Sequence, residues 1–271
     1  MCNRHPTDWR LLLLVRPERL PAKRQWPVRA RIRASIPPHP PALLALLSVL
    51  ALACTPALSH AQASWSGNAS WLSDYRFRGQ PLSDGKATPQ LNINLDSAAG
   101  WYLGGFASGV TVGERDGAQI LGYAGYAWRG GDGWSWDGGC TQTVYTRLRN
   151  ADYLECYGGA SAGNVSMRLY YAPHYLGRDA RTLYGEITLL YPLHPRISLL
   201  AHAGLLHTLS GTAAPGIPER NRYDARLGLS FSAGDWSAQL VRTISESDAL
   251  RYSRYEQRSA QAWVASIGYA F

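Results

Sequence analysis

The chain has 271 residues, of which 17% are charged and 11% aromatic, with 27 Gly and 16 Tyr. The net charge of +8 comes almost wholly from residues 1–63, which hold 9 Lys or Arg against 2 Asp or Glu. Residues 64–271 are therefore close to neutral, which excludes a polycationic nucleic-acid-binding surface there. A composition rich in aromatic residues and Gly but poor in charge favours an all-β fold.

Residues 1–63 have the pattern of a leader that ends in a signal peptide. An apolar run over 41–54 follows several arginines and precedes small residues, and it is shorter than the ~20 residues of a spanning helix. We expect cleavage after Ala63, with Ala61 as the alternative. A single membrane anchor and a lipoprotein modified at Cys54 are further alternatives. Because the segment before the run is long and mixed in charge for a signal, we hypothesise that translation starts further downstream.

The rest of the chain alternates apolar and polar residues with period two, in segments of about ten residues separated by turn residues. Leu91, Ile93 and Leu95, for example, alternate with amides and an acid. No later run of 18 apolar residues predicts a spanning helix. We predict twelve strands, at residues 65–78, 88–96, 101–112, 117–128, 133–147, 152–160, 163–173, 181–191, 196–209, 221–232, 235–245 and 261–271.

The connections between these strands sort by length, because short turns alternate with several longer, more polar loops such as 210–220 and 245–260. This sorting is typical of outer-membrane barrels, with short periplasmic turns and longer external loops. The polar face carries Asn, Gln, Ser, Thr and Tyr, unlike the Lys- and Glu-rich surface of a soluble protein. The sequence therefore predicts a closed antiparallel transmembrane β-barrel of about twelve strands at residues 64–271, with its apolar face toward lipid.

The chain ends abruptly on an aromatic residue, in the alternating segment Gln-Ala-Trp-Val-Ala-Ser-Ile-Gly-Tyr-Ala-Phe. Within lipid every backbone polar group must be paired, so the first and last strands of a sheet must meet. We expect this segment to be the last strand of the barrel. Its Tyr269 and Phe271 match the signal that the bacterial barrel assembly machinery reads, which makes that machinery an expected partner.

Two motifs give the chain a family resemblance. The first is Ser73-Asp74-Tyr75-x-Phe77-Arg78-Gly79, and the second is Asp152-Tyr153-x-Glu155-x-Tyr157. With further matches over most of residues 64–271, the chain resembles the TorF family of porins. The resemblance implies a pore in the outer membrane of a Gram-negative bacterium. Pro81-Leu82 departs from the family, which has Ser-Gln there, and this leaves the details of the first loop open.

If the apolar face meets lipid, the polar residues line the lumen. Twelve strands enclose more room than the ~8 that side chains fill, and less than the 16–18 of wide porins. We therefore expect passive diffusion of small hydrophilic solutes or ions through a narrow channel. The lumenal arginines either brace the wall by pairing with lumenal acids or face water along a solute path. The expected inward residues are Asp74, Arg76, Arg78, Asn92, Asn94, Asp96, Asp137, Arg168, Tyr170, Tyr184, Glu186, His202, Asp224 and Arg226.

Two cysteines remain after the leader, Cys140 and Cys156, at equal distances from Leu148. A hairpin centred on Leu148 would place them opposite each other on neighbouring strands. We expect a disulfide between them in an exported protein, with two free thiols as the alternative. Metal binding is not expected, because no second Cys or His stands at ligand spacing.

No catalytic, cofactor or metal site is expected. None of His174, His194, His202 and His207 lies in a Gly-x-Ser-x-Gly or His-Glu-x-x-His context. Two other functions stay open: a non-conducting structural or adhesive barrel that uses its long loops, and, less favoured, a membrane-embedded lipid hydrolase. The expected partners are outer-membrane lipid and small solutes, and no nucleic acid.

Overall fold

A computed structural model describes residues 63–112, 115–131, 133–147, 151–214, 216–246 and 261–271. The predicted leader, apart from Ala63, lies outside these residues, as does most of the loop at 245–260. Among the described residues, no helix is long and apolar enough to cross a membrane. The elements are β1 (Ala63–Leu72), β2 (Arg76–Phe77), β3 (Gln80–Pro81), β4 (Thr88–Ser97), β5 (Trp101–Val112), β6 (Arg115–Arg129), β7 (Ser135–Tyr145), β8 (Tyr153–Ala162), β9 (Val165–Ala172), the 3₁₀ turn η1 (Tyr175–Gly177), β10 (Ala180–His194), β11 (Ile197–Gly211), β12 (Asn221–Ala233), β13 (Trp236–Ser245) and β14 (Gln261–Ala270).

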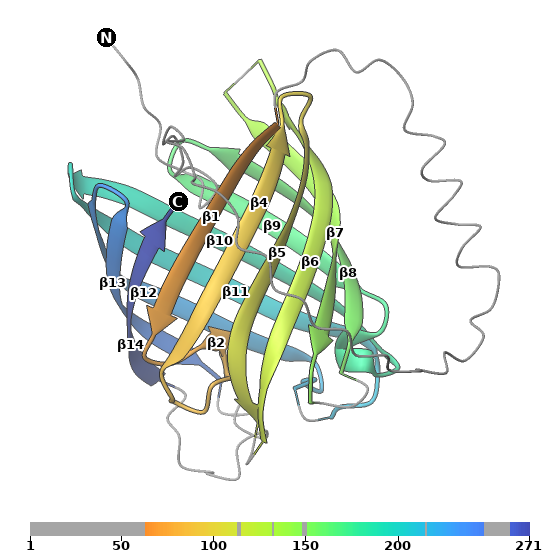
Figure 1. Ribbon diagram of the computed structural model, residues 1–271. Helices are drawn as coiled ribbons and strands as arrows, with labels where there is room; N and C mark the ends of the chain where they lie inside the picture. The colour runs from red at the N-terminus through yellow and green to blue at the C-terminus, as the bar shows by residue number, and fades with distance from the viewer. Residues whose placement is uncertain (1–62, 113–114, 132, 148–150, 215, 247–260) are drawn as a thin grey trace, which may run out of the picture. The chain divides into compact units, whose positions relative to one another are not determined.

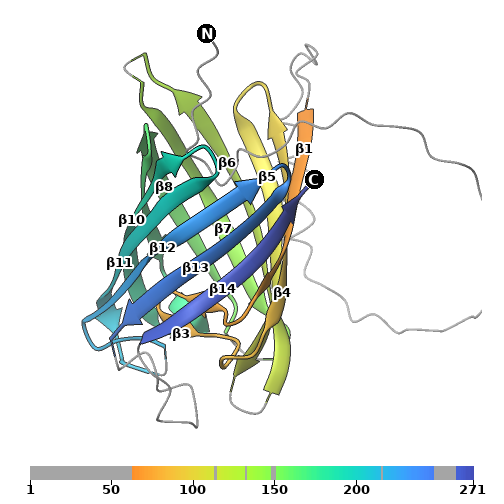
Figure 2. The ribbon, with the colours of Figure 1, turned by 90° about the vertical axis from the view of Figure 1, so that its left-hand side faces the viewer.

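Twelve of these strands form one closed antiparallel ring, in which each strand pairs with its neighbour in sequence (Figures 1 and 2). The ring closes where β1 meets β14, with Trp71 opposite Ile267. Beyond the last ladder residue, Gly67 and Phe271 exchange two backbone hydrogen bonds of 3.0 Å. Closure leaves no free sheet edge, which is the condition for a sheet in lipid. The predicted closed barrel of twelve antiparallel strands is confirmed.

The two faces of the wall have opposite chemistry to those of a soluble protein. Outward side chains are apolar and exposed: Trp65 is 66% exposed and Leu227 57%. Inward side chains are polar and buried: Gln119 is 0% exposed and Glu155 3%. Soluble monomers rarely expose a continuous apolar surface of this kind, whereas a lipid-facing wall requires one.

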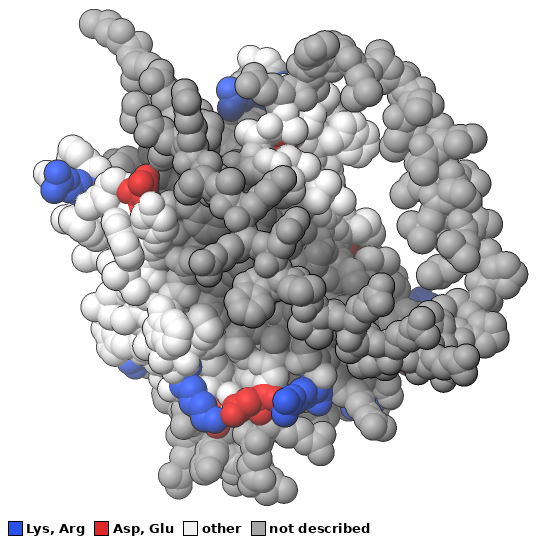
Figure 3. Space-filling view, viewed as in Figure 1, with Lys and Arg blue, Asp and Glu red and all other residues white. Residues whose placement is uncertain are grey.

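Connection length separates the two ends of the barrel. The short turns, at residues 98–100, 130–134, 163–164, 195–196 and 234–235, lie at the end drawn uppermost in Figure 1. Most of the opposite end, here called the loop end, carries longer connections, although β5 and β6 are joined by only two residues. Figure 3 shows Lys, Arg, Asp and Glu side chains in a row at the loop end of the visible face.

The predicted first strand, 65–78, is too long, because β1 ends at Leu72. Residues 73–87, here called the inward loop, turn into the barrel and contain the β2–β3 hairpin, with Phe77 opposite Gln80. The two residues between them have positive φ, 49° for Arg78 and 77° for Gly79. Two consecutive positive φ values are typical of a type I′ hairpin turn, which Gly accepts without strain and Arg does not.

Cys140 and Cys156 face each other on β7 and β8. The structure joins them in a disulfide that links positions 16 residues apart. Both side chains lie on the exposed outer face, so the bond ties two neighbouring strands together from the lipid side.

Candidate functional site: the lumenal cavity and the inward loop

The inward loop is held to the barrel wall by a buried ion pair. Arg78 Nη1 and Nη2 donate to Glu155 Oε1 and Oε2 on β8, at 2.7 and 2.8 Å. The two side chains are only 4% and 3% exposed. Such a bidentate pair fixes direction as well as distance. Arg78 and Glu155 come from the two motifs that carry the family resemblance, so these motifs meet inside the barrel.

Aromatic rings surround the Arg78 guanidinium, whose carbon lies 4.3 Å from the ring centre of Tyr184 and 5.1 Å from that of Tyr170. Burial by itself lowers the pKa of Arg78, but the facing Glu155 carboxylate more than offsets this effect. The net pKa is raised and the guanidinium stays charged. The contacts of this cation with a carboxylate and several ring faces offset the local strain of its backbone.

The base of the inward loop is fixed by Asp74 and Tyr75. The Asp74 carboxylate accepts hydrogen bonds from Ser83 Oγ at 3.1 Å, from the Gly85 N–H at 3.0 Å and from Arg76 Nε at 2.7 Å. The Tyr75 hydroxyl donates to Gln119 Oε1 on β6, at 2.7 Å. Burial raises the pKa of the Tyr75 phenol, which therefore acts as a neutral donor.

An apolar cluster fills the loop end inside the ring. It combines residues of the inward loop and η1 with Ile217 and inward residues near the ends of the strands. Gly79 lies so close to Ser245 and Asp224 that a Cβ there would have to displace them. Within the described part of the chain, this packing therefore narrows the lumen at the loop end. The members of the cluster are Tyr75, Leu82, Val110, Tyr145, Tyr153, Ala172, Tyr175, Leu176, Ala180, Tyr184, Leu206 and Ile217.

Behind the inward loop lies a cavity of about 600 Å³, with Tyr75, Arg76, Phe77 and Arg78 at one end. Two opposite walls of the ring line it, and they differ in chemistry. The wall of β4, β1, β14 and β13 presents uncharged amides and hydroxyls: Ser66, Asn68, Ser70, Gln90, Asn92, Asn94, Ser237, Gln239 and Ser266. The wall of β7 to β10 presents tyrosines and charges: Thr141, Glu155, Tyr157, Arg168, Tyr170, Tyr184 and Glu186.

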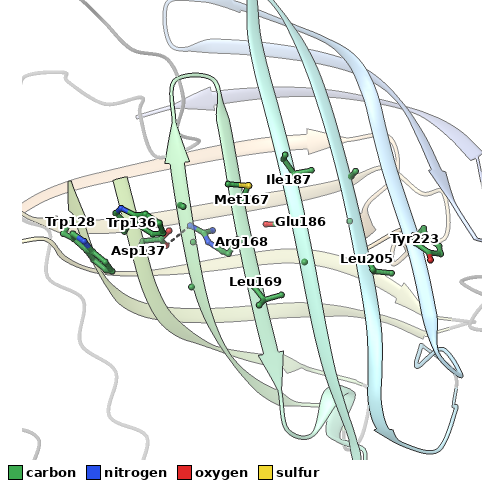
Figure 4. Close-up of a pocket in the computed structure, with 16 residues that line it drawn as sticks. Trp128, Trp136, Asp137, Met167, Arg168, Leu169, Glu186, Ile187, Leu205 and Tyr223 are labelled. Atoms are coloured by element: carbon green, nitrogen blue, oxygen red, sulfur yellow. Dashed lines mark hydrogen bonds and ion pairs between the residues drawn. The ribbon is translucent and has the colours of Figure 1, made fainter. Parts of the chain in front are cut away.

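The charged wall is cross-linked by its own side chains. Arg168 Nη2 donates to Asp137 Oδ2 at 2.8 Å, an ion pair drawn as a dashed line in Figure 4. The Arg168 guanidinium also lies over the Tyr157 ring, at 4.9 Å. The Tyr170 hydroxyl donates to Glu186 Oε1 at 3.3 Å. Of the two roles considered for lumenal arginines, bracing therefore describes Arg168.

A second network crosses β10, β11 and β12. The Tyr184 hydroxyl donates to Asp224 Oδ2 at 3.1 Å, and His202 bridges Asp224 at 3.1 Å and Thr188 at 3.0 Å. Gly204 leaves space for this network, because a Cβ at position 204 would overlap the Tyr184 hydroxyl and the Asp224 carboxylate. His202 is buried among wall side chains, so we interpret the network as bracing.

The remaining predicted lumenal residues also lie on the inward face. Asn94 Nδ2 donates to Asn92 Oδ1 at 2.7 Å, and the Tyr123 hydroxyl donates to Asn94. Asp96 is half-buried opposite Tyr102, next to the β4–β5 turn. Asp74, Arg76 and Arg78 point inward from the inward loop and not, as predicted, from a strand of the ring.

Glu155 and Gln119 were missed as site residues from the sequence. Glu155 could have been found, because it stands in the Asp-Tyr-x-Glu-x-Tyr motif on an inward position. No pattern in the sequence around Gln119 marks it as a site residue. Its role is to accept the hydrogen bond from Tyr75, which lies 44 residues earlier in the chain. The terminal Tyr269 and Phe271 are exposed on the outer face, and Tyr269 packs its ring 5.0 Å from that of Trp236.

Another hollow, of about 740 Å³, lies on the outer side of the wall, against β6 to β12 (Figure 4). Outward Gly158, Gly185 and Ala203 form its low points between larger apolar side chains such as Trp136 and Leu205. It is a depression in the apolar outer surface and offers little to a polar solute, so the lumenal cavity is the candidate site.

The fold and the cavity define a porin-like closed β-barrel, and a solved porin structure shares this fold. A NanC porin structure superimposes with a TM-score of 0.51 at 10% identity, covering 77% of this chain and 99% of that one. A KdgM porin gives 0.48 at 14% identity, covering 76% and 99%. LpxR from Salmonella typhimurium gives 0.39 at 10% identity, covering 76% and 99%. At these identities the likeness concerns the fold, which is the kind found in bacterial outer membranes.

The chain belongs to the family described as "Bacterial protein of unknown function (Gcw_chp)", whose model matches residues 57–271. That match spans the whole barrel. No curated protein matches the sequence.

Proposed function

We propose that the protein is an outer-membrane porin that passes small hydrophilic solutes or ions by passive diffusion, as its resemblance to TorF-type porins implies. The observation that carries the proposal is the lumenal cavity of about 600 Å³ with polar lining on two opposite walls. A wall built only for stability would be filled by side chains, as eight-stranded barrels are. A polar space of this size has room for water and for small hydrophilic solutes, which supports the proposal.

The inward loop sets the limit on this transport. Because it narrows the loop end, the passage of solutes depends on whether the loop keeps the position that Arg78 and Glu155 hold. Transport of small solutes at low conductance follows from such a barrier. The expected partners are outer-membrane lipid at the apolar face and the barrel assembly machinery at Tyr269 and Phe271.

A non-conducting structural barrel is the second candidate, and the filled loop end favours it. Its apolar cluster resembles a small protein core more than a gate. The two functions differ in one property, permeability, which is directly measurable.

Liposome swelling separates them. We expect liposomes that contain the protein to swell in neutral solutes the size of glycine or glycerol and not in solutes the size of a trisaccharide. Heat-denatured protein is the control for leakage. Swelling no faster than the control for every solute would establish the non-conducting barrel, and equal swelling in all solutes would contradict the barrier formed by the inward loop.

A further inference from the structure

Arg226 has a different environment from the other arginines of the cavity. It lies on the inward face of β12, opposite His202 on β11 and Thr243 on β13. Its side chain lines the cavity and is exposed there. Arg226 was predicted to line the lumen, but the sequence did not distinguish it from its neighbours.

The other three cavity-lining arginines each have a carboxylate partner within 2.8 Å: Asp74 for Arg76, Glu155 for Arg78 and Asp137 for Arg168. The Arg226 guanidinium makes no ion pair or hydrogen bond with any residue in the described ranges. Asp224, two positions earlier on the same face of β12, accepts a hydrogen bond from Tyr184 and shares one with His202. It feels the charge of Arg226, although the described structure shows no hydrogen bond or ion pair between these two side chains.

Arginines outnumber carboxylates among the side chains that line the cavity, although the carboxylates that pair with Arg76 and Arg168 lie next to it. Four arginines line it, against two carboxylates, Glu155 and Glu186. Asp74, Asp137 and Asp224 pair with groups of the wall or the inward loop and do not line this cavity. Glu186 lies two strands away from Arg226, on β10, and accepts from Tyr170.

A guanidinium with open donors in a confined space attracts small anions. Its five N–H groups suit the geometry of carboxylate and phosphate oxygens, and charge-assisted hydrogen bonds are the stronger ones. Low-dielectric walls focus the field of the charge into the cavity. Neutral donors such as Gln239 and Ser266 line the same cavity farther along the barrel, because Gln239 lies opposite Ser230 and not opposite Arg226.

We propose that the cavity contains a binding site for a small oxyanion, carboxylate or phosphate, centred on Arg226, and that such anions are the solutes the barrel prefers. The second half of this proposal rests on the proposed porin function, and the first half does not. Arg226 is then the residue that determines specificity, while Arg78 and Arg168 hold the structure of the lumen.

Calorimetric titration of the detergent-solubilised protein with inorganic phosphate and with acetate tests the site directly. We expect binding of at least one probe, weakened about five- to tenfold by Arg226→Gln, the loss of one charge-assisted hydrogen-bonding group. Arg226→Lys should recover part of the affinity. Arg196→Gln, which removes the same charge from an exposed turn, is the matched control and should change nothing.

Equal affinity in wild type and Arg226→Gln, or no binding of either probe, would overturn the site. An equal loss in Arg196→Gln would show a general charge effect and overturn it too. The zero-current potential in a KCl gradient then tests preference: wild type should favour chloride, and Arg226→Gln should shift toward potassium. Binding without any conductance would retain the site and reject the porin function.

Discussion

The two ends of the barrel use the same alternating strands for different purposes. At the loop end, inward side chains meet the inward loop in a packed cluster with a buried ion pair. Toward the short turns, inward amides and hydroxyls line open space. The difference comes from the connections, because only a long loop can enter the ring and complete a core. The alternation of apolar and polar residues in the strands therefore determines the wall of the barrel. The long connections determine where the lumen is narrowed.

Removing an inward carboxylate from each end gives the largest expected contrast. Glu155→Ala leaves the Arg78 guanidinium buried without its partner, which should lower the free energy of unfolding by about 3–5 kcal/mol. The measurement is urea unfolding in detergent micelles. The matched control is Asp96→Ala, which removes a half-buried carboxylate near the short β4–β5 turn. Its free energy of unfolding should stay within about 0.5 kcal/mol of the wild-type value. Similar losses at the two sites would contradict the distinction between the ends.

Both ends of the barrel share one apolar outer surface. Leu240 and Gln239 are neighbours at the middle of β13, one outward and one lining the cavity. Leu240→Arg should destabilise the barrel folded in bilayers by about 2–4 kcal/mol, because a charge at the bilayer midplane is costly.

Gln239→Arg points the same charge into water and should cost far less. Unfolding of both variants in lipid vesicles is the measurement. If Gln239→Arg proved the more harmful of the two, the assignment of the faces would be reversed.

The strands of the wall could be predicted from the sequence, because the alternation that marks a strand is a local pattern. Alternation gave the strand count, and the terminal aromatic strand gave the closure, since both depend on neighbouring residues alone. The same rule extended the first strand too far. Asp74, Arg76 and Arg78 alternate with Tyr75 and Phe77 as strand residues do, although they form a hairpin inside the ring.

The site could be predicted only in part, because it depends on distant contacts. Arg78 and Glu155 are 77 residues apart, and no spacing rule connects them. Alternation placed Arg168 and Arg226 on the lumenal face. It could not show that Asp137 pairs with the first, or that the second has no such partner among the described residues. That distinction comes from the tertiary arrangement of β7, β9 and β12.

The most direct test of the account is single-channel recording in planar bilayers, comparing wild type with the double variant Arg78→Gln, Glu155→Gln. The double variant removes the ion pair that holds the inward loop and leaves the net charge of the lumen unchanged. We expect small or rare openings in wild type, and a conductance at least about threefold higher, or openings far more frequent, once the charge-assisted pair is lost. Identical conductance in both proteins would contradict the role of the inward loop as the barrier.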